Sequence, residues 1–416
     1  MSGGGEGSGG EHVVALWSDD EGATWSHPPV ALEPPPLGLQ LANAYSTVLL
    51  APGLAIGGGD RVIALYGMNL ENVTTDPATH AHLSRTDCQG EFVSRYSDDG
   101  GATWSPRVVV PYRRTPIDYG NEWNGTLKLF WTVDQTKIRD RIAYFAFTKI
   151  GKWLLGPPEE LWFLQSSNVL TEANLSNVVW ALGPEGDHGL PPPFLPPGDR
   201  SSTIEEGHLL PLVASPGFVM IGRTTMGYLA AAQTRAPAST TASGWGPTGY
   251  AQYYDPGHGF PLSPLNASAS AFGGAHAGLK NPRGPITAKY FPSTSGVSSG
   301  NRWLLLYYNN NGRSYDLSAR SVEATEASQS RNPYWLCGGV EARGTILWSQ
   351  PDIVIFGREM TAPGYPDFIQ GVDGSIFITE TQKTVARVHK IPADLLASLW
   401  SQPSVNVTAP GYTQVL

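Results

Sequence analysis

The sequence predicts an all-β protein built from repeated antiparallel sheet units, and three observations support this prediction. Short apolar segments rich in Val, Ile, Phe and Tyr alternate with Gly, Pro, Asn and Ser along most of the 416 residues, as strands bounded by turns do. An eight-residue turn motif occurs twice. Hydrophobic residues make up 41% of the chain and aromatic residues 10%, which excludes a chain that is disordered throughout.

The elements follow from the local patterns. Seven apolar segments are predicted strands: residues 12–18, 61–68, 141–147, 217–223, 302–309, 352–357 and 375–380. Residues 392–400 are predicted to form a short C-terminal helix, because Pro392 and Asp394 favour a helix start. The Gly- and Ser-rich residues 1–11 are expected to be a flexible arm. We therefore expect residues 12–416 to form a single domain.

A repeated motif gives the strongest signal. Ser18–Trp25 and Ser97–Trp104 both follow the pattern S-x-D-x-G-x-T-W, and an apolar segment precedes each copy. Asp and Gly favour a tight turn, the hydroxyl groups can bind its backbone, and Trp can cover the hairpin with apolar surface. Weaker versions span residues 234–245 and 338–348. Four hairpins of one type indicate a repeated sheet.

This motif resembles the Asp-box, or BNR repeat, of sialidases and other β-propellers. The resemblance implies an all-β, sialidase-like propeller with four-stranded antiparallel blades, and we expect six blades. Asp-boxes lie at the edges of blades, far from the active centre, and also occur in propellers that catalyse nothing. The motif therefore predicts fold and not activity.

The second half of the chain resembles the sialidases in further residues. Glu206 precedes Arg223 by 17 positions, close to the family's spacing of its catalytic glutamate and a carboxylate-binding arginine. Arg331, Tyr365 and Glu380 then follow in the family's order. The resemblance implies that Tyr365 is the nucleophile, that Glu206 is its base, and that Arg223 and Arg331 bind the substrate carboxylate. It also makes Glu380 a candidate substrate-binding residue.

The chemistry explains this choice of residues. A sugar with a carboxylate on its anomeric carbon repels an anionic nucleophile, so a neutral phenol activated by a glutamate is suitable. Arginine suits the substrate carboxylate because its planar fork of donors matches two oxygens and stays charged. The resemblance thus implies an exo-glycosidase that releases a terminal acidic sugar, sialic acid or a related ulosonic acid, with retention of configuration.

The chain departs from the family at two positions. No arginine precedes Arg61, although sialidases carry one before the first Asp-box. The segment best matched to the family's acid/base aspartate, residues 41–46, contains no Asp. Asp118, in a polar and aromatic segment, is our replacement candidate for the acid. Arg283, in a rigid Lys-Asn-Pro-Arg turn, is a secondary candidate for binding an acidic sugar.

Other interpretations stay open. Tyr365 could be a packing residue, Asp118 a turn former, and Arg223 or Arg331 a member of an ordinary surface ion pair. A propeller polysaccharide lyase acting on uronic acids would use the same residue types. A non-catalytic glycan-binding propeller would explain the two departures directly.

Charge and composition narrow the choice of partners. Lys and Arg number 27 against 36 Asp and Glu, a net charge of −9 that opposes binding to nucleic acid. No apolar run reaches the length of a membrane span, about 18 residues. His208, His276 and His389 lack metal-ligand spacing, and no nucleotide-binding loop is present. We therefore expect an acidic glycan as partner, no metal, cofactor, nucleic acid or membrane, and a monomer.

The cellular compartment is not determined by the sequence. Cys88 and Cys337 could form one disulfide, but two thiols in a chain of this length often serve only in packing. The N-terminus lacks the basic and apolar parts of a signal peptide. Five potential N-glycosylation sites slightly favour secretion: Asn72, Asn124, Asn174, Asn266 and Asn406.

Overall fold

The structure is a computed structural model in which the chain divides into two compact units, Met1–Leu190 (unit 1) and Pro191–Leu416 (unit 2). It describes residues 10–20, 22–33, 41–152, 159–193, 203–224, 227–234, 244–246, 248–253, 278–281, 284–292, 302–308, 331–342, 344–357, 364–381 and 386–407. The predicted arm lies almost wholly outside these residues. The single domain over residues 12–416 stays a prediction.

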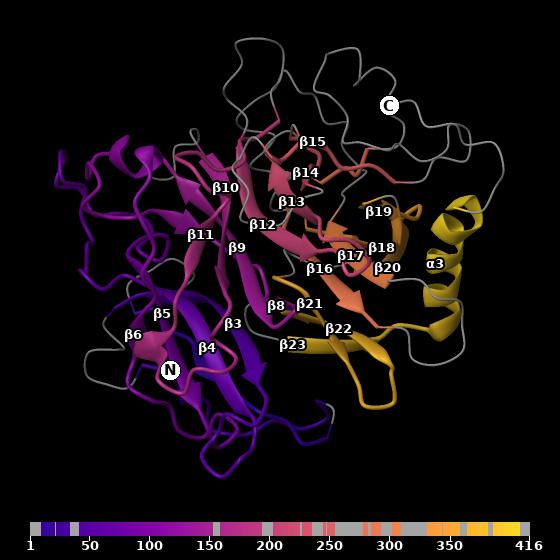
Figure 1. The fold of residues 1–416 in the computed structure, drawn as a ribbon, viewed down its shortest axis with the longest axis horizontal. Coiled ribbons are helices and arrows are strands. Elements are labelled where there is room, and N and C mark those ends of the chain that lie inside the picture. Colours follow the sequence, from indigo (N-terminus) through magenta and orange to yellow (C-terminus); the bar gives the residue numbers. More distant parts are fainter. Residues whose placement is uncertain are drawn as a thin grey trace. The chain divides into compact units, whose positions relative to one another are not determined.

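Unit 1 contains a two-stranded ribbon and two larger antiparallel sheets (Figure 1). The ribbon pairs β1 (Val14–Ala15) with β2 (Val30–Ala31). The next sheet has the order β3 (Asn43–Ala51), β4 (Arg61–Met68), β5 (Glu91–Ser97), β6 (Val108–Val109). The third has the order β11 (Ala181–Gly183), β10 (Glu159–Ser166), β9 (Ile142–Ile150), β7 (Phe130–Trp131), with β8 (Lys137–Arg139) also paired to β9. Two short 3-10 helices, η1 (Pro116–Tyr119) and η2 (Leu175–Asn177), lie in the connections.

Unit 2 contains three antiparallel sheets and a helix (Figure 1). The first has the order β12 (Ile204–Pro211), β13 (Phe218–Thr224), β14 (Ala230–Thr234), β15 (Gly249–Tyr250). The second has the order β16 (Ile286–Phe291), β17 (Arg302–Tyr308), β18 (Tyr334–Ala342), β19 (Thr345–Trp348), with β20 (Asp352–Ile355) also paired to β18. The third comprises β21 (Asp367–Gln370), β22 (Ile376–Thr381) and β23 (Ala386–Lys390). Helix α3 (Ala393–Val407) confirms the predicted C-terminal helix.

The fold is an all-β β-propeller, and the described residues form five blades instead of the predicted six. Among the described residues, five sheets contain three or more strands. The first copy of the repeated motif follows β1 and precedes β2, and these two strands pair only with each other in the described sheets. The motif predicts a hairpin of two strands. It does not predict that further strands pair with this hairpin to make a complete blade.

Both full copies of the motif form the same turn. In the second copy, Ser97 Oγ donates to Asp99 Oδ1 at 2.7 Å and accepts from the Gly101 amide at 2.7 Å. Asp99 in turn accepts from the Thr103 amide at 2.8 Å and from its hydroxyl at 2.6 Å. The first copy repeats these bonds around Asp20. The motif is therefore a local folding device, as its residue types predict.

Helix α3 packs on the second sheet of unit 2. A side-chain carbon added at Gly338 of β18 would lie 2.9 Å from Leu399, so the helix can approach the strand this closely only at a glycine. Trp400 donates its indole hydrogen to the Trp303 carbonyl at 2.9 Å, and its ring lies 4.9 Å from the Arg302 guanidinium carbon. The C-terminal helix thus completes the core over β17 and β18.

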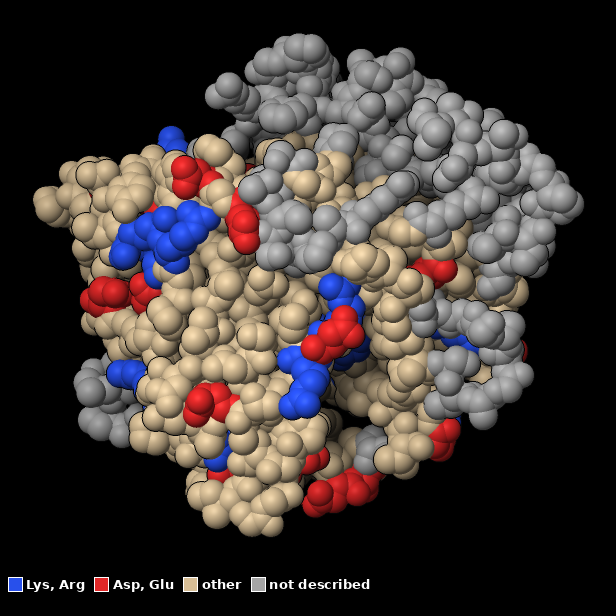
Figure 2. All heavy atoms as spheres, in the orientation of Figure 1, with Lys and Arg blue, Asp and Glu red and all other residues tan. Residues whose placement is uncertain are grey.

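The structure also bears on the two cysteines, on membrane-spanning segments and on the distribution of surface charge. Cys88 and Cys337 are both buried, and neither forms a disulfide with a described residue. No helix in the described part of the chain is both long and apolar enough to cross a membrane. On the face drawn in Figure 2, acidic and basic side chains lie in small, separate groups among neutral residues.

Candidate active site

Strands β12 and β13 position the first two candidate residues. Glu205 of β12 lies directly opposite Arg223 of β13, and the register then shifts between Glu205 and His208. At this bulge Glu206 adopts a φ of +50°. A left-handed conformation costs a residue with a side chain about 1–2 kcal/mol, and such conformations cluster at functional sites. The bulge inserts one extra carboxylate beside the arginine.

Glu206 is in contact with Tyr365 from a distant part of the chain. The Tyr365 hydroxyl donates to Glu206 Oε1 at 2.7 Å. Tyr365 lies between Gly364 and Pro366, just before β21, and is partly buried, whereas Glu206 is buried. A phenol that donates to a carboxylate is the arrangement that general-base activation of an oxygen nucleophile requires.

Two arginines lie at this pair. Arg223 Nη2 is 3.0 Å from Glu206 Oε1 and 3.0 Å from Glu205 Oε2, so one guanidinium balances two buried carboxylates. The Arg331 guanidinium carbon is 5.7 Å from the centre of the Tyr365 ring, a cation–π contact. Arg331 is half-buried, whereas Arg223 is buried. The structure thus brings Tyr365, Glu206, Arg223 and Arg331 together.

Burial dominates the electrostatics of the pair. It raises the pKa of Glu206, an effect that Arg223 and the Tyr365 hydrogen bond oppose and Glu205 reinforces. Burial and the Glu206 charge raise the pKa of Tyr365, while Arg223 and Arg331 oppose the rise. The phenol is therefore neutral at ordinary pH, and a raised carboxyl pKa makes Glu206 a stronger base than an exposed glutamate.

One carboxylate oxygen at this site has no hydrogen-bond partner in the part of the chain that the structure describes. Glu206 Oε2 is buried and has no partner among the described residues. Buried carboxylate oxygens are nearly always hydrogen-bonded, and exceptions are commonly places for a proton, water or ligand. Glu206 can therefore accept a second hydrogen bond without breaking the one from Tyr365.

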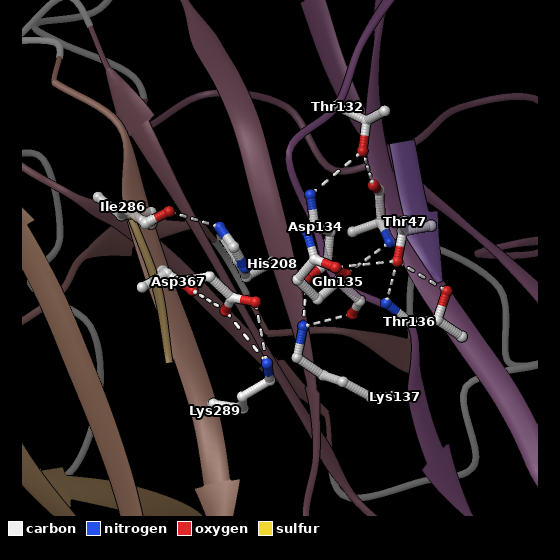
Figure 3. Close-up of polar contacts among 12 residues, drawn as sticks. Thr47, Thr132, Asp134, Gln135, Thr136, Lys137, His208, Ile286, Lys289 and Asp367 are labelled. Carbon is white, nitrogen blue, oxygen red and sulfur yellow. Dashed lines mark hydrogen bonds and ion pairs between the residues drawn. The ribbon is translucent and has the colours of Figure 1, made fainter. Parts of the chain in front are cut away.

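Strand β16 connects the two segments that carry the pair (Figure 3). His208 of β12, two residues after Glu206, donates from Nε2 to the Ile286 carbonyl of β16 at 2.9 Å. Lys289 of β16 reaches Asp367, two residues after Tyr365, at 3.0 and 3.2 Å. Both anchors lie within two residues of a candidate catalytic side chain, and such fixed supports are needed to hold reacting groups in place.

Figure 3 also shows a polar group within unit 1. Asp134 accepts from the Ala146 amide at 2.7 Å and pairs with Lys137. Thr47 accepts from the Thr136 amide at 2.7 Å, which joins β3 to the segment before β8. The Thr47–Thr136 bond ties two sheets of unit 1 together.

Asp118, the predicted acid, lies in unit 1 and is bound by its neighbours. Its Oδ2 accepts from the Thr115 amide at 2.8 Å and lies 2.6 Å from Lys149 Nζ. The side chains of Asp118 and Lys149 are each 1% exposed. Asp118 closes the start of helix η1, a role consistent with the alternative interpretation as a turn former. Its role as an acid stays a prediction.

Glu380 and Arg283 are the two remaining predicted substrate-binding residues. Glu380 on β22 is buried opposite Arg387 of β23, with its Oε1 3.5 Å from Arg387 Nη1 and 3.6 Å from His389 Nε2. Burial raises the pKa of Tyr334, and the negative charge of Glu380 adds to this rise. Arg283 lies outside the described residues.

The sequence did not single out two features. Unit 1 has a second tyrosine–carboxylate–arginine group: the Tyr45 hydroxyl donates to Asp87 Oδ2 at 2.8 Å, and Arg85 pairs with the same carboxylate. Tyr45 has a φ of +58° at a bulge in β3 that matches the bulge of β12. In unit 2, the Tyr308 hydroxyl donates to the backbone carbonyl of Gly364, the residue before Tyr365. No local sequence signal marks either feature, since both depend on contacts between separate segments.

Comparison with solved structures shows the fold. The NanB sialidase from Streptococcus pneumoniae, in complex with 2-[(3-chlorobenzyl)ammonio]ethanesulfonate, matches 93% of this chain at 12% identity with a TM-score of 0.51. This chain spans 63% of that chain. At this identity the likeness establishes a shared propeller fold alone. No protein-family model and no curated protein matches the sequence.

Weaker matches include two other glycoside hydrolases. Zg3597, a family 117 enzyme from Zobellia galactanivorans, matches 89% of this chain and 93% of its own, at 12% identity and a TM-score of 0.41. A GH43_1 enzyme from Xanthomonas citri matches 85% of this chain and 88% of its own, at 10% identity and a TM-score of 0.38. TM-scores this low carry no argument about function.

Proposed function

We propose that the protein is a retaining exo-glycosidase that releases a terminal acidic sugar, sialic acid or a related ulosonic acid, from a glycan. The observation that carries this proposal is the 2.7 Å hydrogen bond from Tyr365 to Glu206, with Arg223 and Arg331 beside it. A neutral phenol with a glutamate base suits a substrate whose anomeric carbon bears a carboxylate.

The proposed reaction has two steps. Glu206 takes the Tyr365 proton as the phenol oxygen attacks the anomeric carbon, and the bond to the leaving oxygen breaks as that oxygen gains a proton. This gives a covalent glycosyl–tyrosine. Water then attacks the same carbon and gives its proton to the group that protonated the leaving oxygen, while the phenol oxygen leaves and regains its proton from Glu206. Two inversions give overall retention.

The arginines have distinct parts in this proposal. Arg331, half-buried and over the Tyr365 ring, is suited to bind the substrate carboxylate with two parallel hydrogen bonds. Arg223 is engaged with Glu205 and Glu206. Its charge therefore also favours the ionised form of Glu206, which accepts the proton, against the effect of burial. Arg283 and Glu380 remain secondary candidates for contact with the sugar.

A proton donor for the leaving oxygen completes the proposed reaction. We retain Asp118 as the candidate, although its Oδ2 is engaged with Lys149 and Thr115. Loss of a general acid lowers rates by about 10²–10⁴. Leaving groups that are already acidic, such as phenols, need little protonation, so they make the reaction observable even where an acid is absent.

One alternative function has support from the geometry. A polysaccharide lyase acting on a uronic acid needs a tyrosine to move a proton and an arginine to neutralise the carboxylate. The engagement of Asp118 favours such a reaction, because β-elimination can use one phenol as both base and acid. A non-catalytic glycan-binding propeller is the second alternative.

The deciding experiment measures release of free acidic sugar from a fluorogenic sialoside. Wild-type protein is expected to release it and Tyr365→Phe to lose this activity while still binding the sugar. An ultraviolet-absorbing unsaturated product from a uronic-acid glycan would instead establish the lyase. Binding of a sialylated glycan without turnover of either substrate would leave a binding protein.

A further inference from the structure

Two buried phenols meet at the backbone next to Tyr365. Tyr308, the last residue of β17, lies directly opposite Tyr334, the first residue of β18. Their rings are stacked, with centres 4.0 Å apart and planes inclined by 29°, and both residues are 0% exposed. Their hydroxyl oxygens are in contact with each other, and both donate to the carbonyl of Gly364, Tyr334 at 2.8 Å.

The Gly364 carbonyl belongs to the peptide unit that begins Tyr365. Because a peptide unit is planar, fixing this oxygen also fixes the Tyr365 amide and limits where its Cα can lie. On the other side, Asp367 is held by Lys289 at 3.0 Å. The short segment that carries the candidate nucleophile is thus anchored before and after Tyr365, whose hydroxyl lies 2.7 Å from Glu206.

The two hydroxyls keep their hydrogens throughout the working pH range. Burial raises the pKa of Tyr308 and of Tyr334 above that of an exposed phenol. A carbonyl oxygen has two lone pairs and can accept from both. A phenylalanine pair would keep the stacked rings but would leave the Gly364 carbonyl without these donors. The hydroxyls therefore do something that packing alone does not require.

We propose that Tyr308 and Tyr334 are positioning residues for Tyr365: together they hold the Gly364 carbonyl so that the Tyr365 phenol meets Glu206 in the reactive geometry. This inference rests on the proposed function, in which Tyr365 attacks the sugar. Neither phenol contacts the reacting atoms in this scheme. Their loss should slow the chemical step and leave substrate binding nearly unchanged, because small misplacements of a nucleophile reduce rates strongly.

The test compares Tyr308→Phe, Tyr334→Phe and the double variant with Tyr307→Phe. Tyr307 is a matched control because it is also almost completely buried, is adjacent on β17, and packs in the core cluster of Cys337 instead of the cluster of Tyr308 and Tyr334. Each single variant is expected to lower kcat about tenfold, the effect of one hydrogen bond, and the double variant about a hundredfold. KM should stay within about twofold, and Tyr307→Phe should keep wild-type kcat.

A second readout does not depend on turnover. 3-Fluorotyrosine at position 365 reports the surroundings of the phenol by its fluorine resonance, which should shift or broaden in the double variant and not in Tyr307→Phe. If wild-type protein cleaves no sialoside, the proposed function fails, yet the fluorine spectra still decide the positioning. An unchanged resonance and kcat in the double variant would overturn the inference, as would a loss confined to KM.

Discussion

The Tyr365 hydroxyl lies 2.7 Å from Glu206 Oε1, although 159 positions of sequence separate the two residues. Neither residue is held by this bond alone. Glu206 is fixed by the bulge of β12 and by Arg223, and Tyr365 by the anchored segment before β21. The pair is therefore assembled by the sheets before any ligand binds, which is the condition for efficient proton transfer.

Glu206→Gln should lower turnover of a sialoside by about 10²–10⁴, because glutamine cannot take the Tyr365 proton. Burial raises the pKa of Glu206. Only the ionised form is a base, so wild-type kcat/KM should fall as pH drops through this raised pKa, above the value of about 4.3 for an exposed glutamate. The pH–rate profile checks this. If Glu206→Gln kept activity, and its pH–rate profile fell at low pH as the wild-type profile does, another residue would be the base.

The same substitution should stabilise the fold. The raised pKa means that folded protein binds this proton more tightly than unfolded protein, so the wild-type free energy of unfolding decreases as pH rises through that pKa. Glu206→Gln removes this loss, and Arg223 keeps its partner Glu205. We expect a gain of about 0.5–2 kcal/mol at neutral pH, measured by urea unfolding. Equal or lower stability would mean that Glu206 serves the fold.

Arg331→Lys and Arg223→Lys should have different effects. Because Arg331 is proposed to bind the substrate carboxylate, its replacement should raise KM for an acidic sugar by about 10–100-fold. Because its side chain is only half-buried, the melting temperature should change little. Arg223 is buried between two glutamates, and its replacement should also lower stability. Steady-state kinetics and thermal melts separate the two. A wild-type KM in Arg331→Lys would remove it from the carboxylate site.

Much of the fold could be predicted from the sequence because strands and turns depend on neighbouring residues. The apolar segments at 61–68 and 217–223 are β4 and most of β13. The repeated turn forms from side chains within five residues of each other. The number of blades could not be predicted in the same way, since it depends on which strands pair after the hairpins have formed.

The candidate site shows a similar limit. The order of Glu206, Arg223, Arg331 and Tyr365 pointed to one site only through a family resemblance, and the structure brings these four together. Nothing in the sequence around Lys149, within an apolar strand, indicated that it would meet Asp118 31 positions away. A buried ion pair of this kind is visible only once the sheet is assembled.

Asp118→Asn should destabilise the protein by about 3–5 kcal/mol, because it leaves Lys149 buried without its carboxylate. Burial already lowers the pKa of Lys149 to about 8. Asp118 opposes this lowering, so Lys149 of the folded variant should lose its proton at a lower pH than in wild type, and the penalty should shrink as pH rises toward about 8. Urea unfolding across this pH range measures the effect.

A double variant, Asp118→Asn with Lys149→Met, separates stability from catalysis. It removes both charges and should recover part of the lost stability. If Asp118 is the acid, the double variant should fold but should hydrolyse a sialoside with a poor leaving group about 10²–10⁴ times more slowly than wild type. The loss of rate should be smaller for a sialoside with a phenolic leaving group. Equal rates for both substrates relative to wild type would dismiss Asp118 as the acid.

Asp99→Ala and Asp20→Ala should differ although both aspartates make the same turn. Hydrogen bonds from Thr103, Ser97 and the turn backbone lower the pKa of Asp99 to about 2, so its contribution to stability is present above the unfolded value and is lost as pH falls toward 2. Its turn joins β5 to β6 in a four-stranded sheet, whereas the turn of Asp20 joins β1 to β2, which pair only with each other in the described sheets. Asp99→Ala should therefore lower the melting temperature of the whole of unit 1. Asp20→Ala should increase hydrogen exchange mainly in β1 and β2, because these strands share no strand pairing with the larger sheets, on which Leu32 packs. Equal losses in melting temperature would show that the ribbon unfolds together with a complete blade.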